Sequence, residues 1–489
     1  GCCGGGKLVR NDVVFRPSSE ESHRLWCHKL REFIDSLGHP KNLFVFVNPF
    51  GGTKAATNIF RDQLKPLLQD AHVQLTVQET KHQLPAKQVV QSLDLSKYDG
   101  ILVEVVNGLL HRQDWDTAIK MPLGVVPAGL VANIEIESEK YRWMRSARMD
   151  FYHQLHAMQV VQSLDFSEYD GIVCVSGDGI LVEVVNGLLQ RQDWDTAIKM
   201  PLGVVPAGTG NGMAKSLLDS VGDPCTVPKA VLAIIRGHKR SLDVATITQG
   251  EARFFSVLML AWGLVADIDI ESEKYRWMGS ARIDFYALTR IFHLRHYTGC
   301  LYFVPAPGFE AYGEPTSYPG SSTSKGRNSD LIDEKSVKLP RLCYEGPEID
   351  LENLGWRVLN GPFISVWLHN VPWGAENTKA APDAKFSDGY LDLIIVKNCA
   401  KLPLLSMMSD MNNGDHVKSP YVMYLKVKVL VLEPGRRLGD QEKEGIIDAD
   451  GEVLARGKGS YQCEQKALMA YDKLQITVDQ GLATLFAPI

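Results

Sequence analysis

A carboxylate that could act as a general base lies in the segment Ser176-Gly-Asp-Gly179. The apolar run 172–175 precedes it and predicts a buried strand, and the following stretch 180–189 is typical of a helix. An Asp between two glycines at the carboxyl end of a parallel strand is a common position for a catalytic group. An Asp-Gly turn that caps a helix has the same sequence. The segment alone therefore leaves Asp178 open to a catalytic or a structural role.

Two more glycine-rich turns stand between a predicted strand and a predicted helix. Asn48-Pro-Phe-Gly-Gly-Thr-Lys54 follows the apolar run 43–47 and precedes helical spacing of apolar residues over 55–68. Pro206-Ala-Gly-Thr-Gly-Asn-Gly212 follows the run 202–205 and precedes a helical stretch over 213–218. Such turns present backbone N–H groups and the positive end of a helix, where phosphate binds well. The first turn is not a GxxxxGK[ST] loop, and it also resembles an ordinary turn.

Three strand–turn–helix units of this kind predict an α/β domain with a parallel sheet. In such a sheet the turns gather along the edge that is formed by the carboxyl ends of the strands. An edge with three glycine-rich turns is suited to a nucleoside triphosphate.

Charged residues are dense within the apolar frame of 262–276. Asp267 and Asp269 would share one face if this segment were a strand, because side chains alternate along a strand. Arg276 and Arg282 could clamp phosphate oxygens. The charged start of a solvated helix explains the same pattern, and the residues alone favour that interpretation.

The chain changes character near residue 242. Short β-rich runs separated by turns predict a mostly antiparallel second domain, at 254–260, 301–304, 363–367, 391–396, 427–432 and 474–478. Residues 312–329 are rich in Gly, Pro, Ser and Thr, which predicts a flexible segment. We therefore expect an N-terminal segment over 1–39, an α/β domain over 40–241, and a β-rich domain over 242–489 with a flexible loop at about 308–340.

The sequence contains a partial internal duplication. Residues 82–94 return at 153–165, an offset of 153 − 82 = 71. Residues 102–129 return at 181–208, but the first copy lacks the Ser-Gly-Asp-Gly turn. Two unequal copies do not make a repeat array. We expect the partial repeat 82–152 to be an insertion in the α/β domain that neither binds nucleotide nor catalyses.

Composition narrows the class of protein. The 489 residues carry 52 Lys and Arg against 58 Asp and Glu, a net charge of −6, which disfavours general binding of nucleic acid. No apolar run is long enough to span a membrane, so any membrane contact is expected to be peripheral. Nine scattered cysteines without metal-ligand spacing indicate a reducing, cytoplasmic compartment.

Taken together, these segments resemble the sphingosine kinases, within the wider diacylglycerol-kinase catalytic family, and are most similar to the plant long-chain-base kinases. The motifs NPFGG, SGDGILVEVVNGLLQRQDW, PLGVVPAGTGNGMAKSL, WGLVADIDIESEKYRWMGSAR and DGE stand in the order of that family. The resemblance covers the chain from Leu43 onward, except the repeat. It implies an α/β nucleotide-binding domain, a C-terminal antiparallel β-sandwich domain and an active site in the cleft between them.

The resemblance also implies the reaction and its residues. An ATP-dependent lipid kinase of this family phosphorylates the primary hydroxyl of sphingoid long-chain bases (sphingosine, dihydrosphingosine, phytosphingosine) to the 1-phosphate. Asp178 would be the general base, Asp269 would hold the substrate ammonium, and Asp267 would assist in binding the substrate. Mg²⁺ is expected with ATP, with no ligands identified. The implied ATP site consists of Asn48, Gly51, Gly52, Thr53, Lys54, Ser176, Gly177, Gly179, Gly208, Thr209, Gly210, Asn211, Arg276, Arg282, Gly451 and Glu452.

Two rival functions stay open at this stage. A diacylglycerol or ceramide kinase would share these motifs, but neither substrate carries the ammonium that a carboxylate at position 269 suits. An inactive lipid- or nucleotide-binding paralogue, broken by the insertion, is the second rival. The expected partners are the sphingoid-base substrate and a peripheral membrane surface.

Overall fold

The computed structural model describes residues 19–36, 38–49, 55–80, 101–102, 123–124, 156–278, 281–320, 343–462 and 467–489. The chain divides into two compact units, one formed by 1–80, 157–463 and 467–489 and the other by 81–156 with 464–466. In the second unit, two short strands, β3 (Ile101–Leu102) and β4 (Leu123–Gly124), pair in parallel. The rest of the predicted insertion 82–152 lies outside the described residues.

The first unit contains the predicted parallel sheet. Its strands are β1 (Asn42–Val47), β2 (Gln74–Glu79), β5 (Gly171–Ser176) and β6 (Leu202–Pro206), in the spatial order β2-β1-β5-β6. Neighbours in this order run parallel. β5 and β6 are buried along their whole length, as expected for apolar strands that are covered on both faces. The strands predicted at 43–47, 172–175 and 202–205 are confirmed, whereas β2 is an edge strand whose mixed sequence did not predict it.

Helices cover both faces of this sheet. Alternate residues of β1 and β5 enter two apolar clusters, so that Phe44 and Cys174 pack in one and Val45 and Val173 in the other. The first cluster includes residues of α8 (His156–Ser163) and α9 (Asp178–Leu189), and the second includes residues of α3 (Lys65–Asp70) and α12 (Val227–Arg236). The helix predicted over 55–68 is confirmed, with a π-helical turn at Phe60–Leu64 between α2 (Ala56–Ile59) and α3. Further helices here are α1 (Glu20–Ser36), α10 (Trp194–Ala197) and α11 (Gly212–Asp219).

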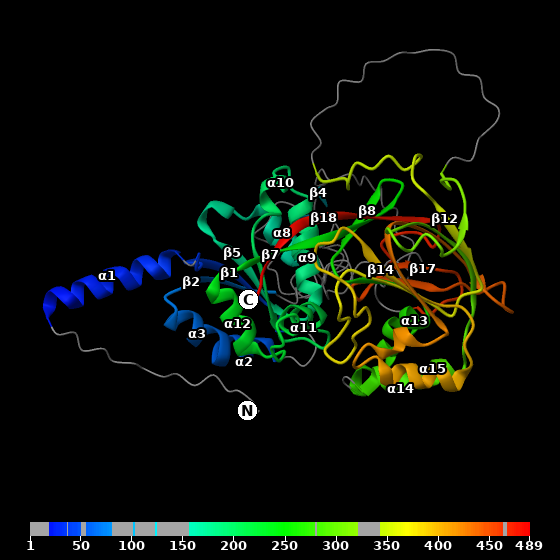
Figure 1. Cartoon of the computed structure of the whole chain (residues 1–489), viewed down its shortest axis with the longest axis horizontal. Coiled ribbons are helices and arrows are strands. Elements are labelled where there is room, and N and C mark those ends of the chain that lie inside the picture. Colours follow the sequence, from blue (N-terminus) through cyan, green and yellow to red (C-terminus); the bar gives the residue numbers. More distant parts are fainter. Residues whose placement is uncertain are drawn as a thin grey trace, which may run out of the picture. The chain divides into compact units, whose positions relative to one another are not determined.

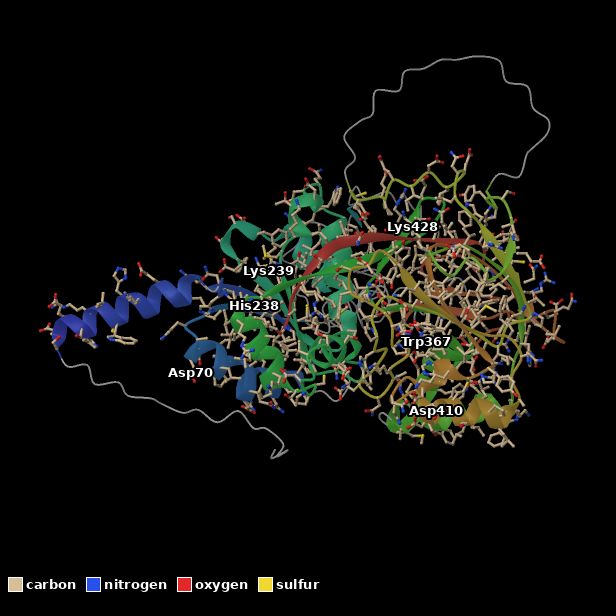
Figure 2. The ribbon with its side chains drawn as sticks, viewed as in Figure 1. Asp70, His238, Lys239, Trp367, Asp410 and Lys428 are labelled. Carbon is tan, nitrogen blue, oxygen red and sulfur yellow. The ribbon has the colours of Figure 1, made fainter. Side chains whose placement is uncertain are left out.

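Antiparallel pairing dominates the rest of the first unit, as predicted (Figure 1). The strands are β7 (Lys239–Gln249), β8 (Ala252–Ser256), β9 (Met259–Gly263), β10 (Tyr297–Pro305), β11 (Glu314–Pro315), β12 (Arg357–Asn360), β13 (Ser365–His369), β14 (Leu391–Val396), β15 (Val422–Arg437), β16 (Ile446–Ala449), β17 (Glu452–Arg456) and β18 (Leu474–Phe486). Buried apolar residues fill this part, and the Trp367 indole of β13 (Figure 2) donates to Sδ of Met259 at 3.0 Å. The helices are α13 (Leu264–Glu271), α14 (Ala281–Phe292) and α15 (Lys401–Asp410), with 3₁₀ turns at Ser272–Met278 and Asp415–Lys418.

The strand β18 belongs to both parts of the sheet. It runs antiparallel beside β7 (Figure 1), and near its end Leu485 pairs in parallel with Leu202 of β6. The ring of Phe486 then lies against Gly171, where a Cβ would stand 2.5 Å from the ring. One continuous sheet therefore joins the β-rich part to the parallel part.

Two sequence-based expectations are corrected. The run 254–260, predicted as one strand, is two strands, because a turn at Val257 and Leu258 separates β8 from β9. The flexible segment predicted from residue 312 is ordered in its first part, where Glu314 pairs with β12 and Tyr318 packs on Trp356 with ring centroids 5.3 Å apart. Residues 321–342 lie outside the described residues.

Candidate active site

Two of the predicted glycine-rich turns pack directly against each other at the carboxyl edge of the parallel sheet. A Cβ on Gly208 would lie 2.3 Å from Cα of Gly177, and a Cβ on Gly177 would lie 2.7 Å from the carbonyl oxygen of Gly210. These contacts leave no space for a side chain at either glycine. The turns after β5 and β6 therefore form one rigid pair, and Asp178 follows directly at the start of α9.

The carboxylate of Asp178 reaches from α9 to the beginning of α11. Its Oδ2 accepts a hydrogen bond from the backbone N–H of Gly212 at 2.8 Å, and its Oδ1 accepts one from Met213 at 3.0 Å. Both donors belong to the first turn of a helix, where backbone N–H groups lack partners within the helix. Asp178 therefore caps a helix, as the structural interpretation of the sequence allowed, but it caps α11 and not its own helix. Its position is fixed by two backbone bonds.

The environment of Asp178 suits a proton acceptor at neutral pH. Burial raises the pKa of its carboxyl group to about 7, against the two backbone hydrogen bonds, which lower the pKa. The negative charges of Asp450 and Glu376 add to the increase. A general base works best when its pKa lies near the working pH. The carboxylate is therefore both positioned and tuned for proton transfer.

The segment 373–376 of the β-rich part contacts the turn after β6 and the start of α11. Asn211 donates to Oε1 of Glu376 at 2.6 Å, and its side chain also bonds to the backbone N–H and C=O of Gly208 at 3.1 Å each. A Cβ on Gly212 would lie 2.5 Å from the carbonyl oxygen of Trp373. The amide of Asn211, predicted as an ATP ligand, thus closes its own turn and ties that turn to the segment 373–376. Thr209, in the same turn, is exposed.

The late acidic turn lies near Asp178, and the negative charge of its Asp450 raises the pKa of the Asp178 carboxyl group. Asp450 has a positive φ of 56°, and its buried carboxylate accepts bonds from the N–H groups of Val257, Leu258 and Met259 at 2.7–3.0 Å. It also accepts one from Ser256 Oγ at 2.9 Å. Asp450 therefore holds the turn between β8 and β9, and it brings the following Gly451 and Glu452 to the site. The charge of Glu452 contributes to a pKa of Glu183 that lies well above its ordinary value, mainly because Glu183 is buried.

Asp269 lies on α13, where it is only partly buried. Burial raises the pKa of its carboxyl group to about 6, and the nearby positive charge of Arg282 acts in the opposite direction. Asp269 also forms a close pair with the buried Asp448 of β16. The structure therefore brings Asp269 to the β16–β17 hairpin that carries Glu452, and it places Arg282 beside Asp269.

Residues 264–271 form a helix, which is the alternative that the residues alone favoured, so the strand that would have placed Asp267 and Asp269 on one face is not formed. Asp267 is fully buried, and its Oδ2 accepts from Arg295 at 3.0 Å and from the hydroxyl of Tyr297 at 2.7 Å. Arg290 lies 3.5 Å from the same oxygen. Glu271, one helical turn later, also accepts from Arg295, at 2.6 Å. Asp267 thus belongs to a buried ion network under α13, which does not support the predicted role in substrate binding.

Several predicted ATP-site residues fall outside the described part of the chain. These are Gly51, Gly52, Thr53 and Lys54 of the first glycine-rich turn, and the side chain of Arg276. Asn48 is described at the end of β1, where its backbone N–H donates to the carbonyl of Val175 at 3.2 Å. The packed pair of turns contains Gly177, Gly208 and Gly210, whereas Ser176 ends β5 and Gly179 lies in the first turn of α9.

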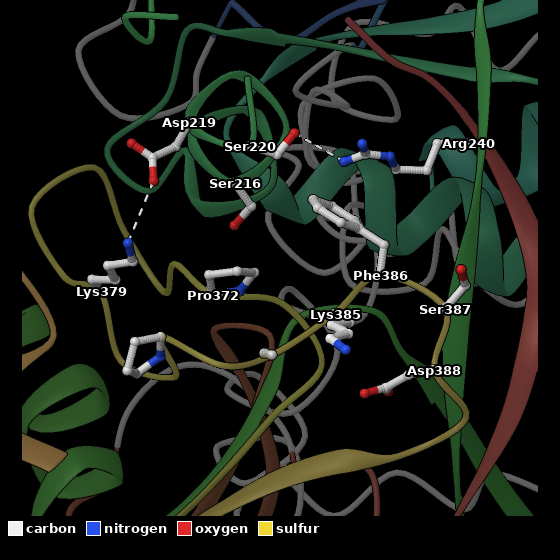
Figure 3. A pocket seen from close by; sticks show the side chains of 12 residues that line it. Ser216, Asp219, Ser220, Arg240, Pro372, Lys379, Lys385, Phe386, Ser387 and Asp388 are labelled. Carbon is white, nitrogen blue, oxygen red and sulfur yellow. Dashed lines mark hydrogen bonds and ion pairs between the residues drawn. The ribbon is translucent and has the colours of Figure 1, made fainter. Parts of the chain in front are cut away.

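A cavity of about 500 Å³ opens at the other end of α11, between Asp219, Arg240, Lys379 and Phe386 (Figure 3). In it Arg240 donates to Ser220 at 2.9 Å, and Lys379 lies 3.7 Å from Asp219. None of the predicted site residues that the structure describes lines this cavity. We do not assign it to the nucleotide or to the lipid.

The next question is whether the described side chains could hold Mg²⁺. Over the described ranges, no three His, Cys, Asp or Glu side chains are grouped in a way that could hold a metal ion. Mg²⁺ in kinases is commonly bound to the phosphates of the nucleotide and to only one or two protein carboxylates. The described residues therefore do not identify its ligands.

Sequence reasoning missed Glu183, Glu376 and Asp448, and it gave no role to Asp450, the first residue of the DGE motif. The three acids of Asp448-Ala-Asp450-Gly-Glu452 were a visible signal of an acidic turn, and the structure places them at the end of β16, in the turn and at the start of β17. Glu376 carried no such signal, since its role depends on contact with Asn211, which is 165 residues away.

Comparison with known proteins agrees with this architecture. The diacylglycerol kinase catalytic domain matches residues 42–150 and again 139–247, and the YegS C-terminal NAD kinase beta sandwich-like domain matches 360–471. The double match corresponds to the internal duplication.

Individual proteins with a similar sequence are lipid kinases by name. Sphingosine kinase 1 of Arabidopsis thaliana is 55% identical over 489 residues, which cover 100% of this chain and 84% of that protein. Sphingosine kinase 1 of Homo sapiens is 32% identical over 61% of this chain and 75% of its own. Ceramide kinase of Homo sapiens is 25% identical over 97% of this chain and 79% of its own. With a catalytic domain, a β-sandwich domain and full-length similarity of this kind, the chain belongs to the sphingosine kinase family, within the diacylglycerol-kinase catalytic family.

Proposed function

We propose that this protein is an ATP-dependent lipid kinase that phosphorylates the primary hydroxyl of sphingoid long-chain bases. The observation that carries the proposal is Asp178, whose carboxylate is fixed by two backbone bonds and has a pKa near neutrality. A partly exposed second carboxylate, Asp269, lies in the same acidic region. One acid serves the hydroxyl, and the other serves the ammonium of the same substrate.

Asp178 acts on the hydroxyl. The lipid O–H donates to the Asp178 carboxylate, the hydroxyl oxygen attacks the terminal phosphorus of ATP, the bond to ADP breaks, and the proton stays on Asp178. In phosphoryl transfer the protein contributes mostly position and charge. The backbone bonds from Gly212 and Met213 supply the position, because they fix both carboxylate oxygens.

The nucleotide binds at the packed glycine turns that hold Ser176, Gly177, Gly208 and Gly210. These turns lead into the N-terminus of α9, where phosphate is favoured, whereas the first N–H groups of α11 are already bonded to Asp178. The cluster of carboxylates around Asp178 would repel phosphate without a counter-ion. Mg²⁺ brought in with ATP would supply positive charge that offsets this repulsion.

Asp269 selects the substrate class. A carboxylate at the head group attracts the protonated amine of a sphingoid base, whereas diacylglycerol and ceramide carry no such charge. The two substrates without an amine would offer the partly buried Asp269 no ammonium to replace the water that they displace from it, which is energetically unfavourable. We therefore favour the sphingoid base over both rival lipids.

A transfer assay tests the function. Purified full-length protein, labelled ATP and Mg²⁺ are combined with sphingosine, phytosphingosine, diacylglycerol or ceramide. We expect label only in the two sphingoid bases. Transfer to diacylglycerol or ceramide at an equal rate would contradict the role of Asp269, and absence of transfer to all four would favour the inactive paralogue.

The insertion should be dispensable for this activity. We expect removal of residues 82–152 to keep or raise kinase activity and to leave the thermal midpoint unchanged or higher. Runs 101–106 and 123–126 repeat the sequences of α9 and β6 segments without the turns of the active site, and near-identical segments can compete during folding. Thermal melts and kinase assays on both proteins measure this. An insoluble or inactive deletion protein beside an active full-length protein would show that the insertion supplies needed structure.

The same proposal includes binding at a membrane surface. No described helix is both long and apolar enough to cross a bilayer. Two neighbouring helices carry large apolar side chains that expose 44–79% of their surface: Phe285, Leu288 and Phe292 on α14, and Leu402 on α15. The two helices are tied together where Lys401 donates to the carbonyl of Phe292 at 2.8 Å. These four residues form the α14–α15 patch. Of its two helices, α14 packs against α13, which carries Asp269, and α15 packs against α14. A lipid substrate would enter from a bilayer in contact with this patch.

We expect the double change Phe292→Gln and Leu402→Gln to weaken binding to phosphatidylcholine–phosphatidylserine vesicles at least about tenfold, because each side chain loses roughly 1.5 kcal/mol or more of apolar transfer energy. Sedimentation with vesicles measures the change. Leu438→Gln is the matched control, since Leu438 is also exposed, at 60%, but lies outside the α14–α15 patch. Equal loss in both proteins, or in neither, would contradict the role of the patch.

A further inference from the structure

Asp448 is an acid whose burial the proposed reaction does not yet explain. It lies on β16, where it pairs with Ala261 of β9, and its side chain is completely buried. Among the described residues, no N–H or O–H group donates to either of its carboxylate oxygens. Its side-chain partner is the carboxyl group of Asp269, on the helix α13 that packs on β16.

Two carboxyl groups in contact satisfy each other only when one of them carries a proton. Two ionised carboxylates repel, and neither has a hydrogen to donate. A pair of this kind holds a single proton over a wide pH range, as in the carboxylate dyads of aspartic proteases. Of the two groups here, Asp448 is completely buried and Asp269 is partly exposed. The proton therefore belongs on Asp448, and the negative charge on Asp269.

We propose that Asp448 is a positioning residue for recognition of the sphingoid ammonium: its protonated carboxyl group donates a hydrogen bond to Asp269 and fixes that carboxylate toward the substrate. This inference rests on the proposed function. The pair then carries one negative charge, which matches the single positive charge of the amine. Asp448 does not touch the substrate and takes no part in the transfer of phosphate.

The charges around the pair agree with this assignment. Burial raises the pKa of Asp448 well above its ordinary value, and the negative charges of Asp269, Asp450 and Glu452 raise it further. Burial also raises the pKa of Asp269, to about 6. Arg282 of α14 and the hydrogen bond from Asp448 lower it, and Glu273 raises it. Asp269 is thus ionised above about pH 6, while Asp448 keeps its proton.

The test compares two variants at position 448 across pH. In the parent protein we expect the KM for sphingosine to rise as pH falls through about 6, because protonated Asp269 no longer pairs with the ammonium. Asp448→Asn keeps a donor of the same shape, so the pH at which the KM for sphingosine begins to rise (the acid limb of the profile) should not change. Asp448→Val removes the donor, which raises the pKa of Asp269 and should move the limb up by about one pH unit. The KM for ATP should stay within about twofold in both variants.

Two outcomes would overturn the proposal. A profile of Asp448→Val that matches the parent would make Asp448 a structural residue without influence on Asp269. If the acid limb of the KM profile moves as far in Asp448→Asn as in Asp448→Val, a hydrogen bond donated by residue 448 does not control the pKa of Asp269. The KM profiles of both variants are interpreted only if the parent protein phosphorylates sphingosine. A parent without this activity would contradict the proposed function and not the role of Asp448.

Infrared difference spectroscopy keeps the proposal testable if Asp448→Val does not fold. At pH 7.5 we expect the parent to show the C=O band of a protonated carboxyl group that is missing from Asp448→Asn. Absence of that difference, with both proteins folded by circular dichroism, would place the proton elsewhere and refute the assignment.

Discussion

Asp178→Asn should lower kcat for sphingosine by about 10²- to 10⁴-fold, which is the usual contribution of a general base. The amide cannot accept the hydroxyl proton. Binding of ATP should change little, because the glycine turns are held by backbone contacts of Gly177, Gly208 and Gly210. Single-turnover transfer and equilibrium binding of a fluorescent ATP analogue measure the two effects.

The variant also tests the capping role of the same residue. In the parent, both carboxylate oxygens accept backbone N–H bonds from α11. An amide offers only one oxygen, so one N–H of α11 loses its acceptor, at a cost of about 1–3 kcal/mol in unfolding free energy. Thermal melts should therefore show a lower midpoint. Retention of most of the activity would remove Asp178 from the role of base, whatever the melt shows.

The pH dependence gives a further signature of this base. The pKa of Asp178 is raised to about 7, and only the ionised form accepts a proton. We therefore expect kcat of the parent to rise with pH up to about 7 and then to level off. The residual rate of Asp178→Asn should lack this limb. A parent profile that is flat between pH 6 and 8 would contradict the assignment.

Asp269→Ala should weaken sphingosine affinity by roughly 10- to 150-fold, while ATP affinity stays nearly constant. The estimate corresponds to about 1.5–3 kcal/mol for a hydrogen bond to a charged group. Separate titrations of the two substrates, read as KM and as direct binding, distinguish the effects. Glu273→Gln is the matched control, because Glu273 is a nearby acid outside the proposed contact with the ammonium. Equal losses for both ligands would make Asp269 a structural residue.

The parallel sheet and its turns were predictable from sequence because their signals are local. Apolar runs of four or five residues before glycine-rich turns identified β1, β5 and β6, and helical spacing identified the helices that follow. The position of Asp178 at the carboxyl edge followed from the same pattern. Each of these conclusions needs only residues that are close in sequence.

Features that depend on distant contacts were not predictable. The residues of 264–271 favoured a charged, solvated helix, but they did not show that Asp267 would be fully buried in an ion network with Arg295. The turn that divides 254–260 is held by Asp450, which is about 190 residues away along the chain. The pair Asp269–Asp448 likewise joins a helix and a strand from distant parts of the sequence. Only the fold brings such groups together.

The pairing of β18 with β6 affects how the protein is made. During synthesis on the ribosome, residues 42–206 of the parallel sheet emerge long before residue 485. Until then β6 has a free edge, and the space beside Gly171 that the ring of Phe486 fills in the folded protein stays open. An open edge strand invites pairing with other chains. Nascent chains of this protein should therefore depend on chaperones until the segment 474–486 has left the exit tunnel.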